Sequence, residues 1–386
     1  MMNIVICSLL KFPDGDAGSI RQNILAKMFK DCGFDVFVVG LGSYTGNKEK
    51  EKDGYKYVSF RRQNNNKFNK ILTYIFYYKN LIKLIKTKKP EYILIDDIGI
   101  IRTMKLKKFC KKNKIKLIHD SVEWYSPEQF KYGKFSLGYI KKDILNRFVI
   151  DESINVIAIS KYLENYYNAK KIMCQRIPIL ISKEDLSHVK NVNLDKITFT
   201  YAGQPGKKDY LNLILDGFSL LNEEQLTKIQ INIVGCTKTQ IIESGYQLNK
   251  LKKIEKQINF YGRVSHKKVL EILQTTDFTL LLRDAEKRYA KAGFPTKMVE
   301  SLSNSTPIIC NLTSDMIMYL KDGVNSLIVK NCNSLEFSET LIKALNLTYK
   351  ERKILFENSY KTAEKCFVYN DYLDNLSQIL CLKNRI

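Results

Sequence analysis

Short runs of apolar residues alternate along the chain with longer stretches in which apolar positions recur every three or four residues. The short runs are typical of strands buried on both faces of a parallel sheet, and the longer stretches predict amphipathic helices that cover it. In the first half, the predicted strands are 3–8, 34–39, 55–60, 92–95, 116–118 and 154–159, and the predicted helices are 20–32, 67–88, 100–113 and 161–168.

The same alternation starts afresh at Thr198. The pattern therefore predicts an α/β fold with two doubly wound, Rossmann-like halves in series, in which ligands lie at the carboxyl ends of the strands. In the second half, the predicted strands are 198–202, 230–234, 259–261, 278–282, 306–310 and 326–329, and the predicted helices are 210–221, 241–248, 267–275, 295–303, 315–320 and 335–345.

The domain limits follow from an irregular stretch at 171–196, where we place the linker near 180–195. A chain of 386 residues is long enough for two domains. We predict a first domain at 1–185 and a second at 190–355. The mostly helical end closes back over the structure, with the helix at 360–386 packing on the first domain.

Neither a membrane span nor a secretory leader is expected. No apolar run approaches the roughly 18 residues that a spanning helix needs, and MMNIVICSLLK has the pattern of a buried strand. The nine cysteines show no C-x-x-C spacing, which is typical of reduced core residues rather than of zinc ligands. A cytoplasmic protein is the expectation.

The net charge of +23 predicts an anionic partner: nucleic acid, a phosphate-bearing substrate or an anionic membrane surface. Arg61–Lys89 holds nine basic residues and Arg102–Lys116 holds eight, and neither run contains an acid. Within the first run, ILTYIFYYKNLIKLIKTKK has aromatics and lysines at helical spacing. It fits a helix facing the core, and it also fits contact with a membrane that carries a lipid-linked acceptor.

The segment YAGQPGKKD at 201–209 is the first candidate for ligand chemistry. A strand ends there, Gly203 allows close backbone approach, and Lys207 or Lys208 adds charge before a helix begins, which suits a phosphate. It is not a Walker A loop. An ordinary strand–helix turn with solvated lysines remains the alternative.

The segment RYAKAGFPTKMVESLSNSTPII is the second candidate. Gly293 and Pro295 predict a turn, with Pro295 at the first helical position. Thr296 and Lys297 follow in the first turn, where we expect their donors to be free for a diphosphate. Glu300, one turn later, could accept hydrogen bonds from two ribose hydroxyls, although a surface acid on a capped helix has the same pattern.

Histidines and acidic pairs give fewer candidates. We expect His266 to be a surface residue, His188 to lie in the linker, and His119 to end a strand at the ligand edge. Asp14 and Asp16 have the spacing of a D-x-D metal site, but their place in a glycine loop favours a role in the turn. Two further acids end a strand, and either face the ligand edge or cap a helix: Asp96 and Asp97.

Taken together, these segments resemble the family 4 glycosyltransferases of the GT-B fold, and the resemblance covers the whole chain. Most of it lies in YAGQPGKKDY, INIVG, INFYGRVSHKKVLEILQTTDFTLLLR, AGFPTKMVESLSNSTPII and DGVNSLIV, which follow the family's order. FPDGDAGSIRQNILAKMFKDCGFDVFVV and VIAISKYLENYY add to it. The resemblance implies two Rossmann-like domains facing across a cleft, with a nucleotide sugar held by the second.

The resemblance also implies roles for individual residues. Glu300 would hold the ribose, Thr296 and Lys297 would meet the diphosphate, and His119 would contact the transferred sugar or the acceptor. The implied catalytic residue is His119, and the implied donor-binding residues are Gly15, Gly18, Gly203, Gln204, Lys207, Lys208, Gly293, Phe294, Pro295, Thr296, Lys297 and Glu300.

Two positions depart from the family pattern. Ala292 stands where the family usually has a glutamate that contacts the sugar, and Gln204 stands where an arginine is common. The resemblance to members with an AGFPTK-like loop implies that the missing glutamate is tolerated, so we expect an active enzyme whose sugar the sequence does not identify.

The implied function is a hexosyl-type, retaining glycosyl transfer from a nucleotide-diphosphate sugar to a glycan or lipid-linked acceptor in bacterial surface polysaccharide synthesis. Helix N-termini and basic side chains would stabilise the leaving diphosphate, so no metal or other cofactor is expected. The expected location is the cytoplasm, or the inner face of the plasma membrane as a peripheral protein.

Two alternatives remain open. A sugar-nucleotide 2-epimerase would share the fold but needs more acids and histidines at the site than this chain offers. A non-enzymatic nucleic-acid binder would need a basic stripe across both halves, whereas the lysine-rich runs lie in the first, so no nucleic-acid partner is expected.

Overall fold

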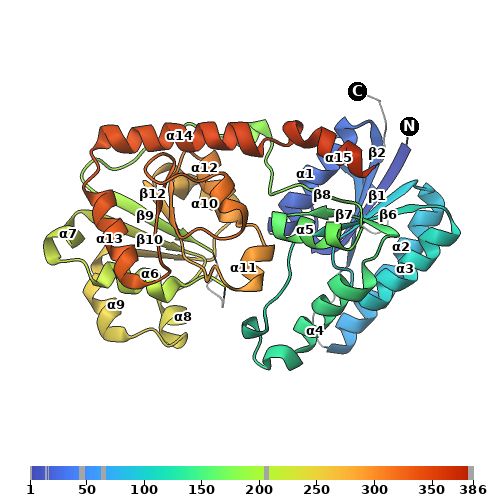
Figure 1. Cartoon of the computed structure of the whole chain (residues 1–386), viewed down its shortest axis with the longest axis horizontal. Coiled ribbons are helices and arrows are strands. Elements are labelled where there is room, and N and C mark those ends of the chain that lie inside the picture. Colours follow the sequence, from blue (N-terminus) through green and yellow to red (C-terminus); the bar gives the residue numbers. More distant parts are fainter. Residues whose placement is uncertain are drawn as a thin grey trace. The chain divides into compact units, whose positions relative to one another are not determined.

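A computed structural model describes residues 2–13, 15, 17–42, 48–61, 67–203 and 208–380, with the backbone alone for residues 67–71. The chain divides into two compact units (Figure 1). The first unit is Met1–Leu180 with Tyr369–Ile386, and the second is Ile181–Val368. Within the described ranges, no helix is long and apolar enough to cross a membrane.

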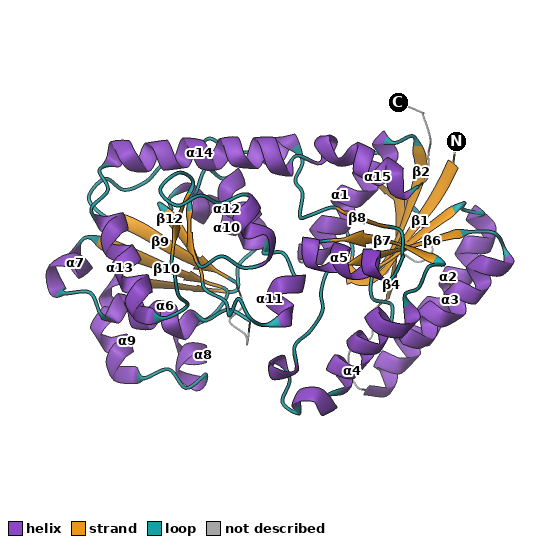
Figure 2. Cartoon of the chain, in the orientation of Figure 1, coloured by secondary structure: helices purple, strands orange, loops and turns teal. Residues whose placement is uncertain are grey.

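An eight-stranded sheet forms the centre of the first unit, with helices packed against it (Figure 2). The strand order is β3-β4-β2-β1-β5-β6-β7-β8, and each neighbouring pair is parallel except β3 with β4. The strands are β1 (Met2–Lys11), β2 (Phe34–Gly42), β3 (Lys50–Lys52), β4 (Tyr55–Arg61), β5 (Tyr92–Ile95), β6 (Lys116–Ser121), β7 (Ile154–Ala158) and β8 (Cys174–Arg176), and the helices are α1 (Ala17–Asp31), α2 (Lys67–Lys88), α3 (Ile100–Lys112), α4 (Leu137–Ile144), α5 (Lys161–Ala169) and α15 (Leu373–Ile379).

A six-stranded, wholly parallel sheet forms the centre of the second unit, in the order β11-β10-β9-β12-β13-β14. The strands are β9 (Ile197–Ala202), β10 (Ile229–Val234), β11 (Ile258–Gly262), β12 (Phe278–Leu281), β13 (Ile308–Cys310) and β14 (Ser326–Ile328). The helices are α6 (Leu211–Ser219), α7 (Glu223–Thr227), α8 (Lys238–Glu243), α9 (Leu248–Ile254), α10 (His266–Gln274), α11 (Arg288–Ala292), α12 (Thr296–Ser303), α13 (Ser334–Leu345) and α14 (Tyr349–Phe367).

Each sheet is covered on both faces, which explains its continuous apolar strands. In β1, Ile4 and Ile6 are buried in one cluster with residues of α1 and β2. In the second unit, the ring of Phe199 lies 5.5 Å from Phe218 and 5.8 Å from Phe278. The predicted α/β class with two doubly wound parallel sheets is confirmed.

The contacts of residues 181–190 explain where the second unit begins. The backbone N–H of Ile181 donates to the carbonyl of Phe367 at 2.9 Å. Nζ of Lys190 donates to two carbonyls near the end of α10, at 2.7 and 2.8 Å. The segment predicted as a linker is therefore bonded to the second unit. That unit begins at Ile181, earlier in the chain than the predicted residue 190.

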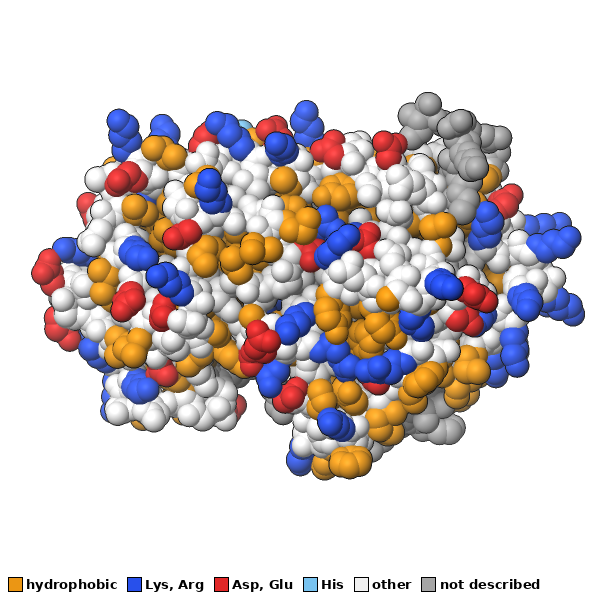
Figure 3. Space-filling model, viewed as in Figure 1, with side chains coloured by type: hydrophobic (Ala, Val, Ile, Leu, Met, Phe, Trp, Pro, Cys, Tyr) orange, Lys and Arg blue, Asp and Glu red, His pale blue; other side chains and the backbone are white. Residues whose placement is uncertain are grey.

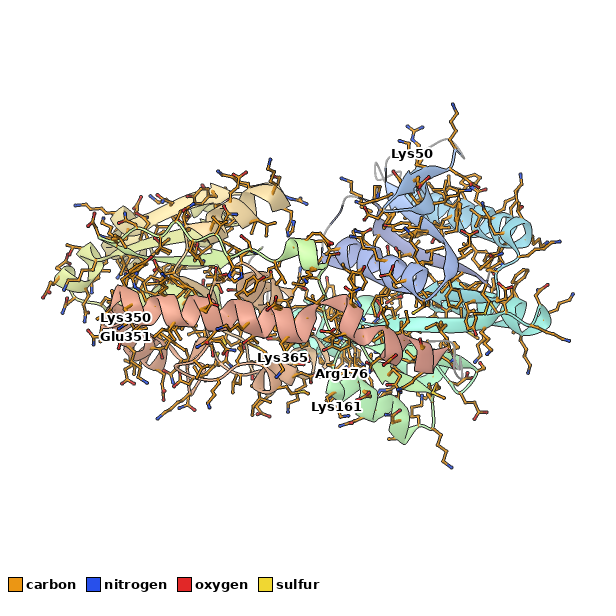
Figure 4. The ribbon with its side chains drawn as sticks, turned by 90° about the horizontal axis from the view of Figure 1, so that it is seen from above. Lys50, Lys161, Arg176, Lys350, Glu351 and Lys365 are labelled. Atoms are coloured by element: carbon orange, nitrogen blue, oxygen red, sulfur yellow. The ribbon has the colours of Figure 1, made fainter. Side chains whose placement is uncertain are left out.

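The end of the chain is shared between the units. A buried ion pair of 2.6 Å between Arg352 and Asp277 fixes α14 to the second unit. Figure 4 shows Lys350 at the beginning of α14 and Lys365 near its end. Past Val368 the chain joins the first unit, where the hydroxyl of Tyr92 donates to the carbonyl of Leu380 at 2.9 Å. Of the predicted helix at 360–386, residues 360–367 thus stay with the second unit.

Several elements differ from those predicted. Residues 314–318 form a 3-10 turn instead of a helix, with Ser314 at a φ of 51°. The stretch predicted as irregular contains β8, whose three residues are too few to show a period. α4 and α11 were not predicted, and both are short.

Candidate functional site

The loop after β9 begins with a close approach of two segments. Gly203 has a φ of +155°, and the side chain of Lys297 lies where a Cβ atom of residue 203 would stand. Glycine is therefore needed for both backbone and space. The carbonyl of Lys208 is held by the Tyr289 hydroxyl at 3.1 Å. Gln204 and Lys207 lie outside the described residues, so their roles remain predictions.

A buried carboxylate, Asp209, joins this loop to two cations. Nε of Arg283 donates to one carboxylate oxygen at 2.7 Å, and Nζ of Lys297 is ion-paired with the other. The hydroxyl of Tyr201 donates to the same carboxylate at 3.2 Å. Burial alone would raise the pKa of Asp209, but Lys297 and Arg283 lower it below its usual range. The carboxylate is therefore ionised.

The pairing corrects the expectation that the side chain of Lys297 is free. Its ammonium lies between Asp209 and the ring of Tyr201, whose centre is 4.2 Å away. Burial lowers its pKa, while Asp209 opposes that effect. Two cations against one carboxylate leave a net positive charge at the carboxyl ends of β9 and β12. Such a fixed cluster favours an anion.

Arg283 was not predicted as a site residue. The sequence does contain a pattern that could have pointed to Arg283. It is the first charged residue after an apolar strand, where the strand reaches the ligand edge of the sheet. Its backbone is held on both sides by Asn311, at 2.9 Å to the N–H and 2.7 Å to the carbonyl. The guanidinium is thus carried on a fixed backbone, and only 14% of the side chain is exposed.

The turn before α12 is held by packing. Gly293 ends α11, and its N–H donates to the carbonyl of Tyr289 at 3.1 Å. Phe294 is buried, with its ring 5.8 Å from that of Tyr319. Pro295 is the N-cap, with a ψ of 105°, and not the first helical residue as predicted. Thr296 begins the helix, whose first N–H groups have no partner within it and form its positive end.

Glu300 lies on α12 one turn after Thr296, so both side chains share a face. Its Oε1 is 3.3 Å from Nε2 of His266, the first residue of α10. The hydrogen bond to Glu300 raises the pKa of His266, against the effect of burial. His266 is half exposed, as expected, but its contact with Glu300 joins two segments that the sequence does not connect.

In the first unit, Gly15 and Gly18 flank the start of α1. The hydroxyl of Ser19 donates to the carbonyl of Lys11 and closes the turn. A Cβ atom at residue 15 would lie 2.5 Å from that carbonyl, so the turn needs glycine. The candidate metal pair at 14 and 16 lies outside the described residues, and no metal-holding group of three His, Cys, Asp or Glu occurs in the described part.

His119 lies within β6 and not at its end as predicted, because the strand continues to Ser121. It stands between Ile95 of β5 and Val156 of β7, and its side chain is fully buried. Burial first, and then the charge of Lys142, lower its pKa to about 3, although Asp97 opposes them. The imidazole is therefore neutral at physiological pH. Neither ring nitrogen has a hydrogen-bond partner of good geometry among the described residues, although the nearby backbone of Asp96 and Ile95 acts to raise the pKa.

Asp96 follows the last residue of β5, Ile95, which is the register partner of His119. Its Oδ1 is buried without a hydrogen-bond partner in the described part of the chain. Burial raises its pKa well above the usual value, and Asp97 and Asp120 add to the effect. By contrast, Asp120 is paired with Arg21 of α1 at 2.7 Å. The ligand edge of the first sheet thus carries buried polar atoms on Asp96 and His119 that have no partner in the described part of the chain.

Comparisons with known proteins relate the second unit to one family and the whole chain to one fold. Residues 182–362, nearly all of the second unit, match the family of glycosyl transferases group 1. The two parallel-sheet, Rossmann-like units have the GT-B fold. The predicted fold and the predicted resemblance are confirmed.

Two curated relatives are similar in sequence. An uncharacterized glycosyltransferase of Methanocaldococcus jannaschii is 21% identical over 65% of this chain and 64% of its own length, so the match spans less than two thirds of that relative. The capsular polysaccharide biosynthesis glycosyltransferase CapH of Staphylococcus aureus is 20% identical over 71% of this chain and 79% of its own.

Two solved structures show the same fold over almost the whole chain. Sucrose-phosphate synthase of Thermosynechococcus elongatus has a TM-score of 0.75 at 12% identity, over 99% of this chain and 98% of that one. HepE of Anabaena, in complex with UDP-glucose, has a TM-score of 0.69 at 12% identity, over 99% of this chain and 100% of that one.

Proposed function

We propose that this protein is a glycosyltransferase that moves a hexose, with retention, from a nucleotide-diphosphate sugar to a glycan or lipid-linked acceptor in the synthesis of a bacterial surface polysaccharide. One observation carries the proposal: the cationic cluster on Asp209 and the start of α12 meet at the ligand edge of the second sheet. The names of CapH and of the HepE complex with UDP-glucose support the polysaccharide role and the donor class.

In this proposal the diphosphate binds at the cationic cluster. The first N–H groups of α12 and the net positive charge of Arg283, Lys297 and Asp209 stabilise the charge that develops on the leaving group. Because Asp209 fixes both cations beforehand, they need little reorganisation when the donor arrives. These residues supply the electrostatic stabilisation, and the proposal assigns no step to a metal.

Glu300 holds the ribose in the proposal. It shares a helix face with Thr296, so a donor whose diphosphate lies at the start of α12 would place its ribose one turn along. Nε2 of His266 lies 3.3 Å from Oε1 of Glu300, and this contact limits the rotation of the Glu300 side chain. The ribose hydroxyls would then add to, or replace, that contact.

The transfer itself needs no strong base. The bond from the anomeric carbon to the diphosphate oxygen breaks, the acceptor oxygen forms a bond on the same face, and its proton passes to the departing diphosphate oxygen. We assign Asp96 and His119 to contact with hydroxyl groups of the sugar or acceptor, because buried polar atoms are normally hydrogen-bonded. The neutral imidazole of His119 can donate through one nitrogen and accept through the other.

A thermal-shift and calorimetric screen of UDP-, GDP-, dTDP- and CMP-sugars tests the proposal. We expect at least one nucleotide-diphosphate sugar to stabilise the protein, and Glu300→Gln to weaken that effect. Glu357→Gln, on the exposed side of α14, is the matched control and should behave like the wild type. If no nucleotide sugar binds, or if Glu300→Gln binds like the control, the donor assignment is wrong.

A further inference from the structure

The first unit exposes large apolar side chains among basic ones on α3 and on the segment 131–148, which we call the docking face. Phe135 is 87% exposed, Phe148 75%, Leu137 69% and Ile101 68%. We propose that this face docks the protein on an anionic lipid bilayer. The inference concerns the first unit alone and does not depend on the donor site.

The apolar side chains follow helical spacing. On α3, Ile101 and Met104 are exposed three residues apart, whereas Leu106 and Cys110 point into the core. In the other segment, Leu137 on α4 and Phe148 in the π-helical turn Leu145–Val149 lie eleven residues apart, which is close to three turns. Each helix therefore presents one outward apolar stripe in addition to its buried side.

The charge around these stripes is almost wholly positive. α3 carries six Lys and Arg residues and no acid. Residues 131–148 carry four exposed basic residues, the buried Lys142, which is paired with Asp97, and one acid, Asp143. That acid is already paired with Arg147 at 2.7 Å and accepts from Trp124 Nε1 at 2.9 Å. An anionic surface would therefore meet no free carboxylate within these two segments.

The two segments belong to one continuous surface. α3 packs beside the π-helical turn Leu145–Val149. Lys107 of α3 is ion-paired with Asp151, just past that turn. Figure 3 shows apolar and basic side chains intermixed in the region where Figure 1 places α4. Side chains of α3 and of residues 131–148 can therefore contact the same membrane surface.

A bilayer is the partner that matches both properties. Exposed Phe and Leu side chains can enter the boundary between headgroups and acyl chains, while neighbouring lysines reach the anionic headgroups. A nucleic acid would pair with the charges but leave Phe135 and Leu137 in water. The helix predicted to meet a membrane, α2, turns Tyr77 and Leu81 into the core and exposes Ile75 and Phe76 at 57%. Contact of α2 with the core is therefore confirmed, and its contact with a membrane stays a prediction.

The first test removes the apolar contacts from the full-length protein. We expect flotation with phosphatidylcholine–phosphatidylglycerol vesicles, and binding roughly 10-fold weaker or more after Phe135→Ser with Leu137→Ser. Ile317→Ser with Leu335→Ser is the matched control, because these side chains are 70% and 67% exposed in the second unit. Equal binding of both double variants would overturn the proposal.

The second test removes charge. Lys105→Gln with Lys108→Gln should weaken binding roughly 30-fold, taking about 1 kcal/mol for each lysine at an anionic surface. Lys350→Gln with Lys353→Gln on α14 is the control of equal charge (Figure 4) and should change binding about twofold or less. Equal binding to pure phosphatidylcholine vesicles, or tighter binding to single-stranded RNA that survives the serine substitutions, would overturn the proposal. Unchanged thermal unfolding midpoints show that each variant is folded.

Discussion

The ligand edges of the two sheets differ in how their buried polar groups are satisfied. In the second unit, Asp209 is bonded to Arg283, Lys297 and Tyr201. In the first unit, His119 is fully buried and Asp96 is partly buried, and both ring nitrogens of His119 and Oδ1 of Asp96 find no partner among the described residues. The polar groups around Asp209 in the second unit are hydrogen-bonded without a ligand. The polar atoms of Asp96 and His119 in the first unit are not.

The difference has physical consequences. A satisfied ionic cluster is rigid and fixes its charges in advance, which suits a diphosphate of constant shape. Unpartnered buried atoms destabilise a fold by about 1–3 kcal/mol each, and a ligand rich in hydroxyl groups relieves that cost. The comparison therefore predicts that mutation of the Asp209 cluster at the second edge weakens the fold, whereas apolar substitutions of Asp96 or His119 at the first edge spare it.

The largest effect is expected for Asp209→Asn. It leaves two buried cations without their carboxylate, and the second unit should lose about 3–5 kcal/mol of its free energy of unfolding. Hydrogen exchange of α12 in urea measures this loss. Since the folded pKa of Asp209 is lowered, its contribution is present above its usual pKa near 3.8 and is lost as pH falls further. Glu357→Gln is the control, and an equally small effect of both variants would contradict the account.

The next effect is the pH dependence of the first unit. His119 has its folded pKa lowered to about 3, so its contribution to stability is complete above its usual value of 6.5 and is lost as pH falls toward 3. The loss should approach about 1.4 kcal/mol per pH unit in that window. Trp124 is the sole tryptophan and lies in the first unit, so its fluorescence follows this unfolding.

His119→Leu should flatten that dependence while leaving stability at pH 7.5 similar or higher. Asp96 acts in the opposite direction, since a raised folded pKa gives a contribution that is full at low pH and is lost as pH rises. Asp96→Leu in parallel separates the two groups. A wild-type slope that survives in His119→Leu would show that the buried imidazole is not its source.

How far the sequence predicts the molecule depends on the range of the interactions. The local pattern of apolar residues predicts the bounds of α2 as the structure has them, and it predicts most strands to within a few residues. Strands are predictable in this way because burial on both faces of a sheet leaves continuous apolar runs. It located Gly203, Lys297 and Glu300 at the ligand edge of the second sheet. The pairing of Asp209 with Arg283 and Lys297 spans 74 and 88 residues, and no local period reveals such a contact.

A smaller effect is expected at Glu300. Glu300→Gln keeps the shape but removes the charged acceptor for two hydroxyl groups, so donor affinity should fall about 10- to 100-fold, as expected for one or two hydrogen bonds to a charged group. Isothermal titration calorimetry measures it. The free energy of unfolding should change little, in contrast to Asp209→Asn, because Glu300 is partly exposed.

The smallest effect is expected for His266→Gln, whose contact with Glu300 is half exposed. Surface pairs of this kind contribute about 1 kcal/mol or less, so donor affinity should change about threefold or less at pH 8. Since Glu300 raises the pKa of His266, the wild type should hold the pair more firmly as pH falls through that pKa, and the variant should lose this dependence. Calorimetric titrations at several pH values check it, and an effect as large as that of Glu300→Gln would mean that His266 itself contacts the donor.

The most direct measurement of the central claim is a calorimetric titration of the full chain with the nucleotide-diphosphate sugar selected by the screen, beside Glu300→Gln and Glu357→Gln. The account predicts saturable binding that is about 10- to 100-fold weaker in Glu300→Gln and unchanged in Glu357→Gln. Equal affinities for all three proteins, or no binding of any nucleotide-diphosphate sugar, would contradict a donor site at the start of α12.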